Sequence, residues 1–185
     1  LIQLSVSIQK CLADHIAVCI ICVFDCRRAN FILARHAVAD EESLAKAKAQ
    51  AERFDRFCRT LKALGVGAGD EVLVPSNTYI ATALAVTYVG AKPVFVEPDI
   101  RTFNIDPALI EEKITPNTKA IMPVHLYGQP CDMDPIMAIA KKHNLVVIED
   151  DAQCFLGKYK GQNAGTIGHM SSFSFQASKH LTSGE

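Results

Sequence analysis

The chain has 185 residues, 49% of them hydrophobic, and a formal net charge of −1. This length and composition are sufficient for one domain with a packed core. No basic stripe is visible, so nucleic acid is not an expected partner. The apolar run at 16–24 is too short to span a bilayer, and the acidic residues beside it are atypical of a signal peptide. We therefore expect no membrane association and a cytoplasmic location.

The first third of the chain differs in composition from the rest. All ten glycines and all eight prolines lie at or after Gly65, while most of the arginines and cysteines precede residue 60. Ordinary chains contain about 7% glycine and 5% proline. Residues 1–63 are therefore expected to form an atypical segment. It is either helical, with a helix over 40–64, or poorly ordered because the stretch is not native to the fold.

Three cysteines in this segment have the spacing with which some metal sites begin. They are Cys19, Cys22 and Cys26, but no second pair and no histidine completes the pattern. Free thiols buried in an apolar segment are the simpler interpretation, so we predict no metal site.

Strands and helices alternate in the remaining two thirds. Helices are predicted up to Val89 with N-caps at 76–78, at 108–114 after Asp106-Pro107, and at 136–143 after Asp134-Pro135. Gly90 and Asn144 are suited to end the first and the last of these. The glycine-rich segment 157–169 is expected to be a hairpin or loop. Apolar runs predict strands at 71–74, 92–97, 119–123, 145–149 and 171–175.

This alternation predicts an α/β fold in which helices cover both faces of a mostly parallel sheet. In an open parallel sheet, ligands bind beyond the carboxyl ends of the strands. Functional residues should therefore be sought directly after the predicted strands.

Two residues in such positions have complementary chemistry. Lys179 follows the last predicted strand in a small, polar turn, where a lysine can form a Schiff base with a carbonyl compound. Asp150 follows the strand at 145–149. A lysine that holds an aldehyde and an acid that holds a pyridinium nitrogen suit pyridoxal 5'-phosphate. Either Asp150 or the adjacent Asp151 could instead be a helix N-cap.

Five segments around these residues form an ordered set of motifs. They are GDEVLVPSNTY at 69–79, GAKPVFV at 90–96, PVHLYGQP at 123–130, IEDDAQ at 148–153 and SFSFQASK at 172–179. Together they resemble the DegT-type nucleotide-sugar aminotransferases, which are fold-type-I pyridoxal phosphate enzymes. The resemblance covers about residues 64–185 and does not include the first third. It implies that 64–185 is part of the large, cofactor-binding domain, without the family's small C-terminal domain.

The resemblance implies a role for each matching residue. Lys179 matches the lysine that binds the cofactor covalently and moves a proton during transamination, and Asp150 matches the acid paired with the pyridine nitrogen. Gln153 matches a residue near the ring and its phenolic oxygen. Tyr79 matches the aromatic residue that stacks on the ring, and Ser174 a hydroxyl that binds the phosphate. Tyr79 and Ser174 could alternatively be packing residues.

The resemblance also implies the activity. The enzyme would transfer an amino group from glutamate or glutamine to a keto group of a nucleotide-activated sugar or cyclitol, in polysaccharide biosynthesis. Its partners would be the keto-sugar nucleotide, the amino-acid donor and a second subunit, since the full-length family members are homodimers. His125 and Tyr127 lie in a matching motif and are interpreted as structural.

One departure leaves an alternative open. The family binds the cofactor phosphate with a Ser-Gly-Thr turn, whereas the corresponding place here has Glu52-Arg53-Phe54-Asp55. A truncated or degenerate relative without activity is therefore the competing hypothesis. Two other classes fit less well. A phospho-receiver domain needs an aspartate at the end of a later strand, and no such aspartate is present here. A nucleotide-binding glycine turn must follow a strand, whereas the glycine run at 65–69 follows a predicted helix.

Overall fold

The computed structural model describes residues 58–175 and 179–181, all within the compact unit Phe54–Gly184. Residues 58–63 are helical and form the end of the helix expected at 40–64. The rest of that helix, the three clustered cysteines and the stretch from Glu52 to Asp55 lie outside the described residues. None of the described helices combines the length and the apolar character needed to cross a membrane.

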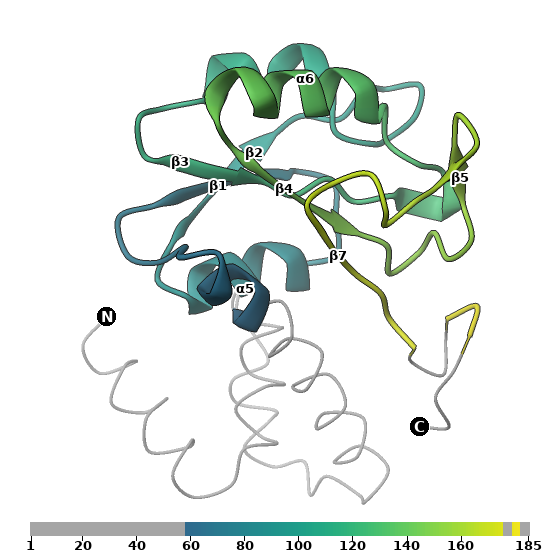
Figure 1. Cartoon of the computed structure of the whole chain (residues 1–185), viewed down its shortest axis with the longest axis horizontal. Helices are drawn as coiled ribbons and strands as arrows, with labels where there is room; N and C mark the ends of the chain where they lie inside the picture. The colour runs from purple at the N-terminus through teal and green to yellow at the C-terminus, as the bar shows by residue number, and fades with distance from the viewer. Residues whose placement is uncertain (1–57, 176–178, 182–185) are drawn as a thin grey trace, which may run out of the picture. The chain divides into compact units, whose positions relative to one another are not determined.

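A five-stranded parallel sheet forms the centre of this unit (Figure 1). The strand order is β2-β1-β3-β4-β7, and every neighbouring pair is parallel. The predicted fold class is therefore confirmed. The strands are β1 (Glu71–Pro75), β2 (Lys92–Val96), β3 (Thr118–Ile121), β4 (Val146–Asp150) and β7 (Met170–Ser172).

Helices cover the two faces of the sheet, with α5 (Ala81–Tyr88) on one side and α6 (Met133–His143) on the other (Figure 1). Each face has its own apolar core, and successive residues of a strand alternate between the two. In β4, Ile148 packs in the core on the α5 side, whereas Val147 packs in the core on the α6 side. This alternation decides which way each side chain at the end of β4 points.

Several predicted helix signals act as expected. Asn144 ends α6 in the left-handed conformation, with φ of 54°. The Asp106 side chain accepts a hydrogen bond from the N–H of Ala108, and Pro107 occupies the first helical position. The segment that follows forms two short 3₁₀ turns, η1 (Pro107–Leu109) and η2 (Glu111–Lys113), in place of the predicted helix of two turns.

The start of α5 was predicted too early. Ser76 donates to Glu97, Asn77 donates to the Phe103 carbonyl, and Thr78 bonds the hydroxyl of Thr82. None of these side chains caps the helix, because the first two bond loop residues and Thr78 bonds a helix side chain. Ile80 stands at the N-cap position with no side-chain hydrogen bond.

The segment between β4 and β7 is the predicted hairpin and loop. A hairpin of β5 (Lys158–Tyr159) and β6 (Gln162–Asn163) is followed by a turn that leads into β7. β7 ends at Ser172, so Ser174 lies beyond the strand, whereas the prediction placed it within the strand 171–175. Asp150 is the last residue of β4 and not the first residue after it.

Candidate functional site

The residues predicted to form the site all follow strands of the sheet. Tyr79 comes after β1. Asp150 is the last residue of β4, and Gln153 follows that strand. Ser174 and Lys179 come after β7. Because all five strands are parallel, these positions lie at the same edge of the sheet, as the prediction requires.

Asp150 is a buried acid on the α5 side of the sheet. Its Oδ2 accepts a hydrogen bond from the Thr82 hydroxyl at 3.0 Å, and its Oδ1 accepts one from the Ala152 N–H at 3.1 Å. Its backbone is fixed as well, because the N–H donates to the Pro123 carbonyl and the carbonyl accepts from the N–H of His125. The side chain is therefore held in one orientation, and the described residues leave acceptor capacity on both oxygens.

Burial raises the pKa of the Asp150 carboxyl, while the two hydrogen bonds and then the electrostatic influences of His125 and Lys179 partly offset this effect. The influence of Lys179, 29 positions away in the sequence, is the smallest of these. A buried, hydrogen-bonded acid with spare acceptor capacity fits the pyridinium side of a pyridoxal cofactor.

Aromatic contacts hold the segment after β7 near the turn after β4. Phe173 and Phe175 each pack edge-on against Phe155, with ring centroids 6.2 Å apart in both pairs. Ser174 lies between these two aromatic residues in the sequence and is half-buried. The contacts thus bring the predicted phosphate ligand to the same region as the acid.

Gln153 and Tyr79 differ in how firmly they are placed. The Oε1 of Gln153 accepts a hydrogen bond from the N–H of Tyr127 at 3.0 Å, and Tyr127 has a left-handed backbone with φ of 57°. Gln153 therefore links the turn after β4 to the turn after β3. Tyr79 is 57% exposed at the start of the α5 region, so its ring is accessible for stacking and is not a core residue.

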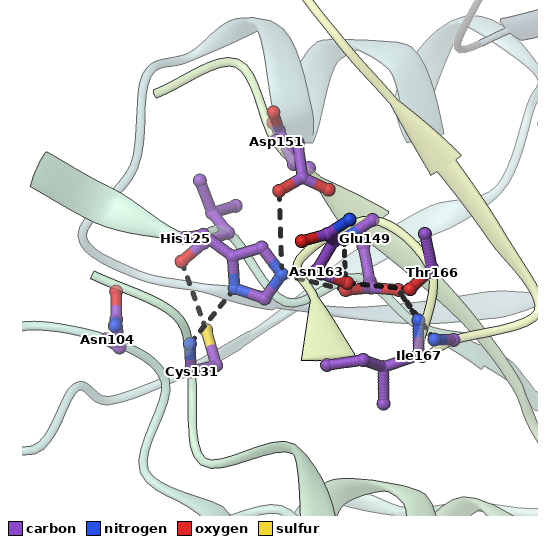
Figure 2. A network of polar contacts seen from close by, with 12 residues as sticks. Asn104, His125, Cys131, Glu149, Asp151, Asn163, Thr166 and Ile167 are labelled. Carbon is purple, nitrogen blue, oxygen red and sulfur yellow. Dashed lines mark hydrogen bonds and ion pairs between the residues drawn. The ribbon is translucent and has the colours of Figure 1, made fainter. Parts of the chain in front are cut away.

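A second polar cluster lies on the α6 side of the sheet, near the carboxyl end of β4. Glu149, His125 and Asp151 are fully or almost fully buried, and Figure 2 shows them side by side. Their potential ligand atoms lie within 4.8 Å of one another. However, the N–H of Cys131 donates to His125 Nδ1 at 3.0 Å. The ring proton must then be on Nε2, which donates to Glu149 Oε2 at 3.0 Å.

This polarity is that of a hydrogen-bond pair. A histidine that binds a metal through one ring nitrogen donates the N–H of its other ring nitrogen to an acceptor. In His125, by contrast, Nδ1 accepts a hydrogen bond from a backbone N–H. These contacts fit the interpretation of His125 as a structural residue. Its ring donates a hydrogen bond to the buried Glu149 carboxylate.

Asp151 is unusual within this cluster. It is 1% exposed, and among the described residues neither of its carboxyl oxygens has a hydrogen-bond partner. Burial is the main cause that raises its pKa to about 7; His125, 4.0 Å away, opposes this rise, and the charges of Glu149 and Asp150 add to it. Asp151 caps no helix, so it does not take the alternative role considered for it.

Two functional contacts were missed from the sequence. Thr82 had no assigned role, and its only signal was a polar β-branched residue among alanines in a buried helix face. Glu149 was treated as a strand end, although a carboxylate directly after four apolar residues must find buried donors.

Known proteins resemble this chain in sequence and in fold. The sequence profile of the DegT/DnrJ/EryC1/StrS aminotransferase family matches residues 57–185. The GDP-perosamine synthase of Caulobacter vibrioides is 58% identical over 125 residues, which cover 68% of this chain and 34% of that protein. An Acidithiobacillus ferrooxidans protein, described as UDP-N-acetyl-3-dehydro-alpha-D-glucosamine 3-aminotransferase, is 49% identical over 159 residues, or 83% of this chain and 43% of that protein.

The second match is long enough to reach into the first third of the chain. The similarity to this relative therefore continues into the segment whose composition differs from the rest. The chain spans about a third of the length of the first of these relatives and less than half of the second.

Solved structures show the same fold. An aminotransferase from Psychrobacter cryohalolentis superposes with a TM-score of 0.70 at 48% identity, covering 71% of this chain and 33% of that one. NtdA from Bacillus subtilis, determined with bound cofactor PMP, superposes with a TM-score of 0.63 at 42% identity, covering 70% of this chain and 29% of that one.

Proposed function

The chain belongs to the DegT/DnrJ/EryC1/StrS aminotransferase family, and from this membership we propose that it carries the lysine and acid of a pyridoxal phosphate site. The observation that carries the proposal is Asp150, a buried and hydrogen-bonded acid at the carboxyl end of β4, with Lys179 following the neighbouring parallel strand β7 in the sequence. The PMP bound to NtdA, the pyridoxamine form of the same cofactor, supports this choice of cofactor.

Asp150 is the residue proposed to hold a proton on the pyridine nitrogen. Its carboxylate is oriented by Thr82 and by the N–H of Ala152, and among the described residues each oxygen keeps an acceptor position that could take an N–H from a ring. A cationic ring would lower the cost of ionising this buried acid, which its hydrogen bonds and the surrounding charges offset only in part. When bound, the cofactor supplies an aldehyde for covalent attachment and a ring that withdraws electrons from the reacting carbon.

Lys179 is proposed to hold the cofactor covalently and to move the proton at the substrate carbon. Ser174, placed by the aromatic contacts of its neighbours, is proposed to donate to the phosphate, and Tyr79 to stack on the ring. Gln153 is proposed to lie near the ring, where its link to Tyr127 fixes its orientation.

The proposed reaction is the transfer of an amino group from glutamate or glutamine to a keto group of a nucleotide-activated sugar or a cyclitol. The names of the relatives support the sugar class: one is a GDP-perosamine synthase and another acts on a UDP-linked 3-dehydro sugar. Because these nucleotides differ among proteins that match the same segment, the proposal does not specify the nucleotide. We also propose a cytoplasmic homodimer for the full-length protein.

Covalent trapping tests the cofactor site directly. The chain is incubated with pyridoxal phosphate, reduced with borohydride and digested, and the modified peptide is located by mass spectrometry. We expect the label on Lys179, and its loss in Lys179→Ala. The matched control is Lys158→Ala, which removes an exposed lysine of the β5–β6 hairpin and should leave the label intact. Labelling spread over exposed lysines in the wild type would favour the inactive relative instead.

A further inference from the structure

Glu149 makes more hydrogen bonds than any other described carboxylate near the site. Its Oε1 accepts from the N–H groups of Ile167 at 2.8 Å and Gly168 at 2.6 Å. Its Oε2 accepts from the N–H of Gly165 at 2.8 Å and from His125 Nε2 at 3.0 Å. Figure 2 shows the turn before β7 wrapped around this carboxylate. Four donors fill the acceptor positions of one buried side chain.

The charge state of this group is defined by its partners. Burial raises the pKa of Glu149, but the hydrogen bonds from His125 and from the three backbone N–H groups lower it by more. The net pKa therefore falls below its ordinary value. His125 is fixed in turn, because the N–H of Cys131 selects its tautomer. The carboxylate is therefore ionised and held in one orientation.

The turn that Glu149 holds determines where β7 begins. β7 has three residues and pairs with β4 in the register Ile148↔Met170, Glu149↔Ser171 and Asp150↔Ser172. Such a short strand has few ladder bonds to specify its register on β4. A slip of one residue would send every following side chain to the opposite face of the sheet.

The backbone around this turn fits closely. A Cβ added at Gly168 would lie 3.0 Å from the Val147 carbonyl, and one added at Gly165 would lie 2.6 Å from Asp151 Oδ2. The N–H of His169 donates to the Val147 carbonyl directly before β7 starts. The side-chain clamp and these close contacts act on the same few residues.

We propose that Glu149 is a positioning residue, which fixes the register of β7 on β4 and thereby places Ser174 and Lys179 opposite Asp150. The alternation of β4 separates the two tasks: Asp150 faces the site, while Glu149, one residue earlier, faces the other side of the sheet and holds the strand that brings the lysine. The consequence for cofactor attachment rests on the proposed function, whereas the clamp itself does not.

Amide hydrogen exchange tests the clamp without any cofactor. In Glu149→Gln, an amide nitrogen replaces one carboxylate oxygen and faces N–H donors, so we expect the amides of Gly165, Ile167 and Gly168 to exchange about tenfold faster. The amides of Gly157 and Ala164 in the same segment donate to the carbonyls of Cys154 and Gly157, and should be unchanged. The matched variant Glu112→Gln changes an exposed carboxylate and should leave all five amides unchanged.

The borohydride label provides the second readout. With register lost, trapping of pyridoxal phosphate on Lys179 should fall in Glu149→Gln and not in Glu112→Gln. Unaltered exchange of the three amides would overturn the clamp, and equal acceleration of all five would assign Glu149 to general stability instead. If Glu149→Gln does not fold, the wild type decides: three amides exchanging as fast as in an unstructured peptide would overturn the proposal. A wild type that takes no label would refute the proposed function but leave the exchange test valid.

Discussion

The Thr82 hydroxyl donates to Asp150 Oδ2 at 3.0 Å, joining residues that are 68 positions apart in the sequence. Thr82 lies in the first turn of α5, and Asp150 ends β4 two strands away from β1, the strand that precedes the helix. The hydrogen bond thus ties the helix on one face of the sheet to the acid of the site. Removal of the hydroxyl would take one hydrogen-bond donor away from the Asp150 carboxylate.

Thr82→Val is expected to lower the free energy of unfolding by roughly 1–3 kcal/mol, because a buried carboxylate loses one of its two side-chain hydrogen bonds. Valine has nearly the same shape, so packing should change little. The control is Thr87→Val in the same helix, an exposed residue whose hydroxyl donates only to the Ala83 carbonyl; this substitution should cost within about 0.5 kcal/mol. Urea denaturation measures both, and equal costs would show that the Asp150 contact adds no stability.

Lys179→Ala in the full-length protein should reduce the half-reaction with glutamate, followed by cofactor absorbance, to background. Lys158 and Lys160 lie in the β5–β6 hairpin, so neither is placed to substitute for it. Lys158→Ala should retain wild-type turnover. Turnover that survives in Lys179→Ala would refute the assignment of the covalent role.

Asp150→Asn should leave cofactor bound but slow the reaction by roughly 10²-fold or more, because a neutral amide does not hold the pyridine nitrogen protonated. Asp151→Asn should be mild by comparison, since Asp151 belongs to the cluster with His125 and Glu149. Rate constants and cofactor affinities of the two variants decide between them. A crippled Asp151→Asn with a mild Asp150→Asn would shift the assigned acid by one residue.

Asp151 predicts a pH dependence of stability. Its pKa is raised from 3.8 to about 7 in the folded protein, so between these values the folded state holds a proton that the unfolded state has lost. Stability therefore falls as pH rises through this window and levels off above it. From pH 5 to pH 8 the loss should be on the order of 2 kcal/mol, and Asp151→Asn should remove it. A variant with the same pH profile as the wild type would show that Asp151 is ionised in the fold.

The sequence predicted those features whose signals are local. Asn144, Asp106 and Pro107 act at the helix ends where they were expected, because caps depend on neighbouring backbone. Asp150 and Lys179 were predicted as site residues because parallel strands place their carboxyl ends together, and their roles stay a prediction. Glu149 was not recognised as a clamp, because its donors come from residues 165–168, and only the pairing of β7 with β4 brings them near.

The sheet order makes the two outer strands of the described region unequal. β2 presents Lys92, an exposed charged residue whose ammonium group pairs with Glu71, and Pro93, which has no N–H to offer a neighbour. β7, on the opposite side, consists of Met170, Ser171 and Ser172 and has neither feature. In a concentrated preparation of this chain, self-association by strand addition should therefore start at β7 and not at β2. A lysine introduced on β7 would be the means of keeping the protein dispersed.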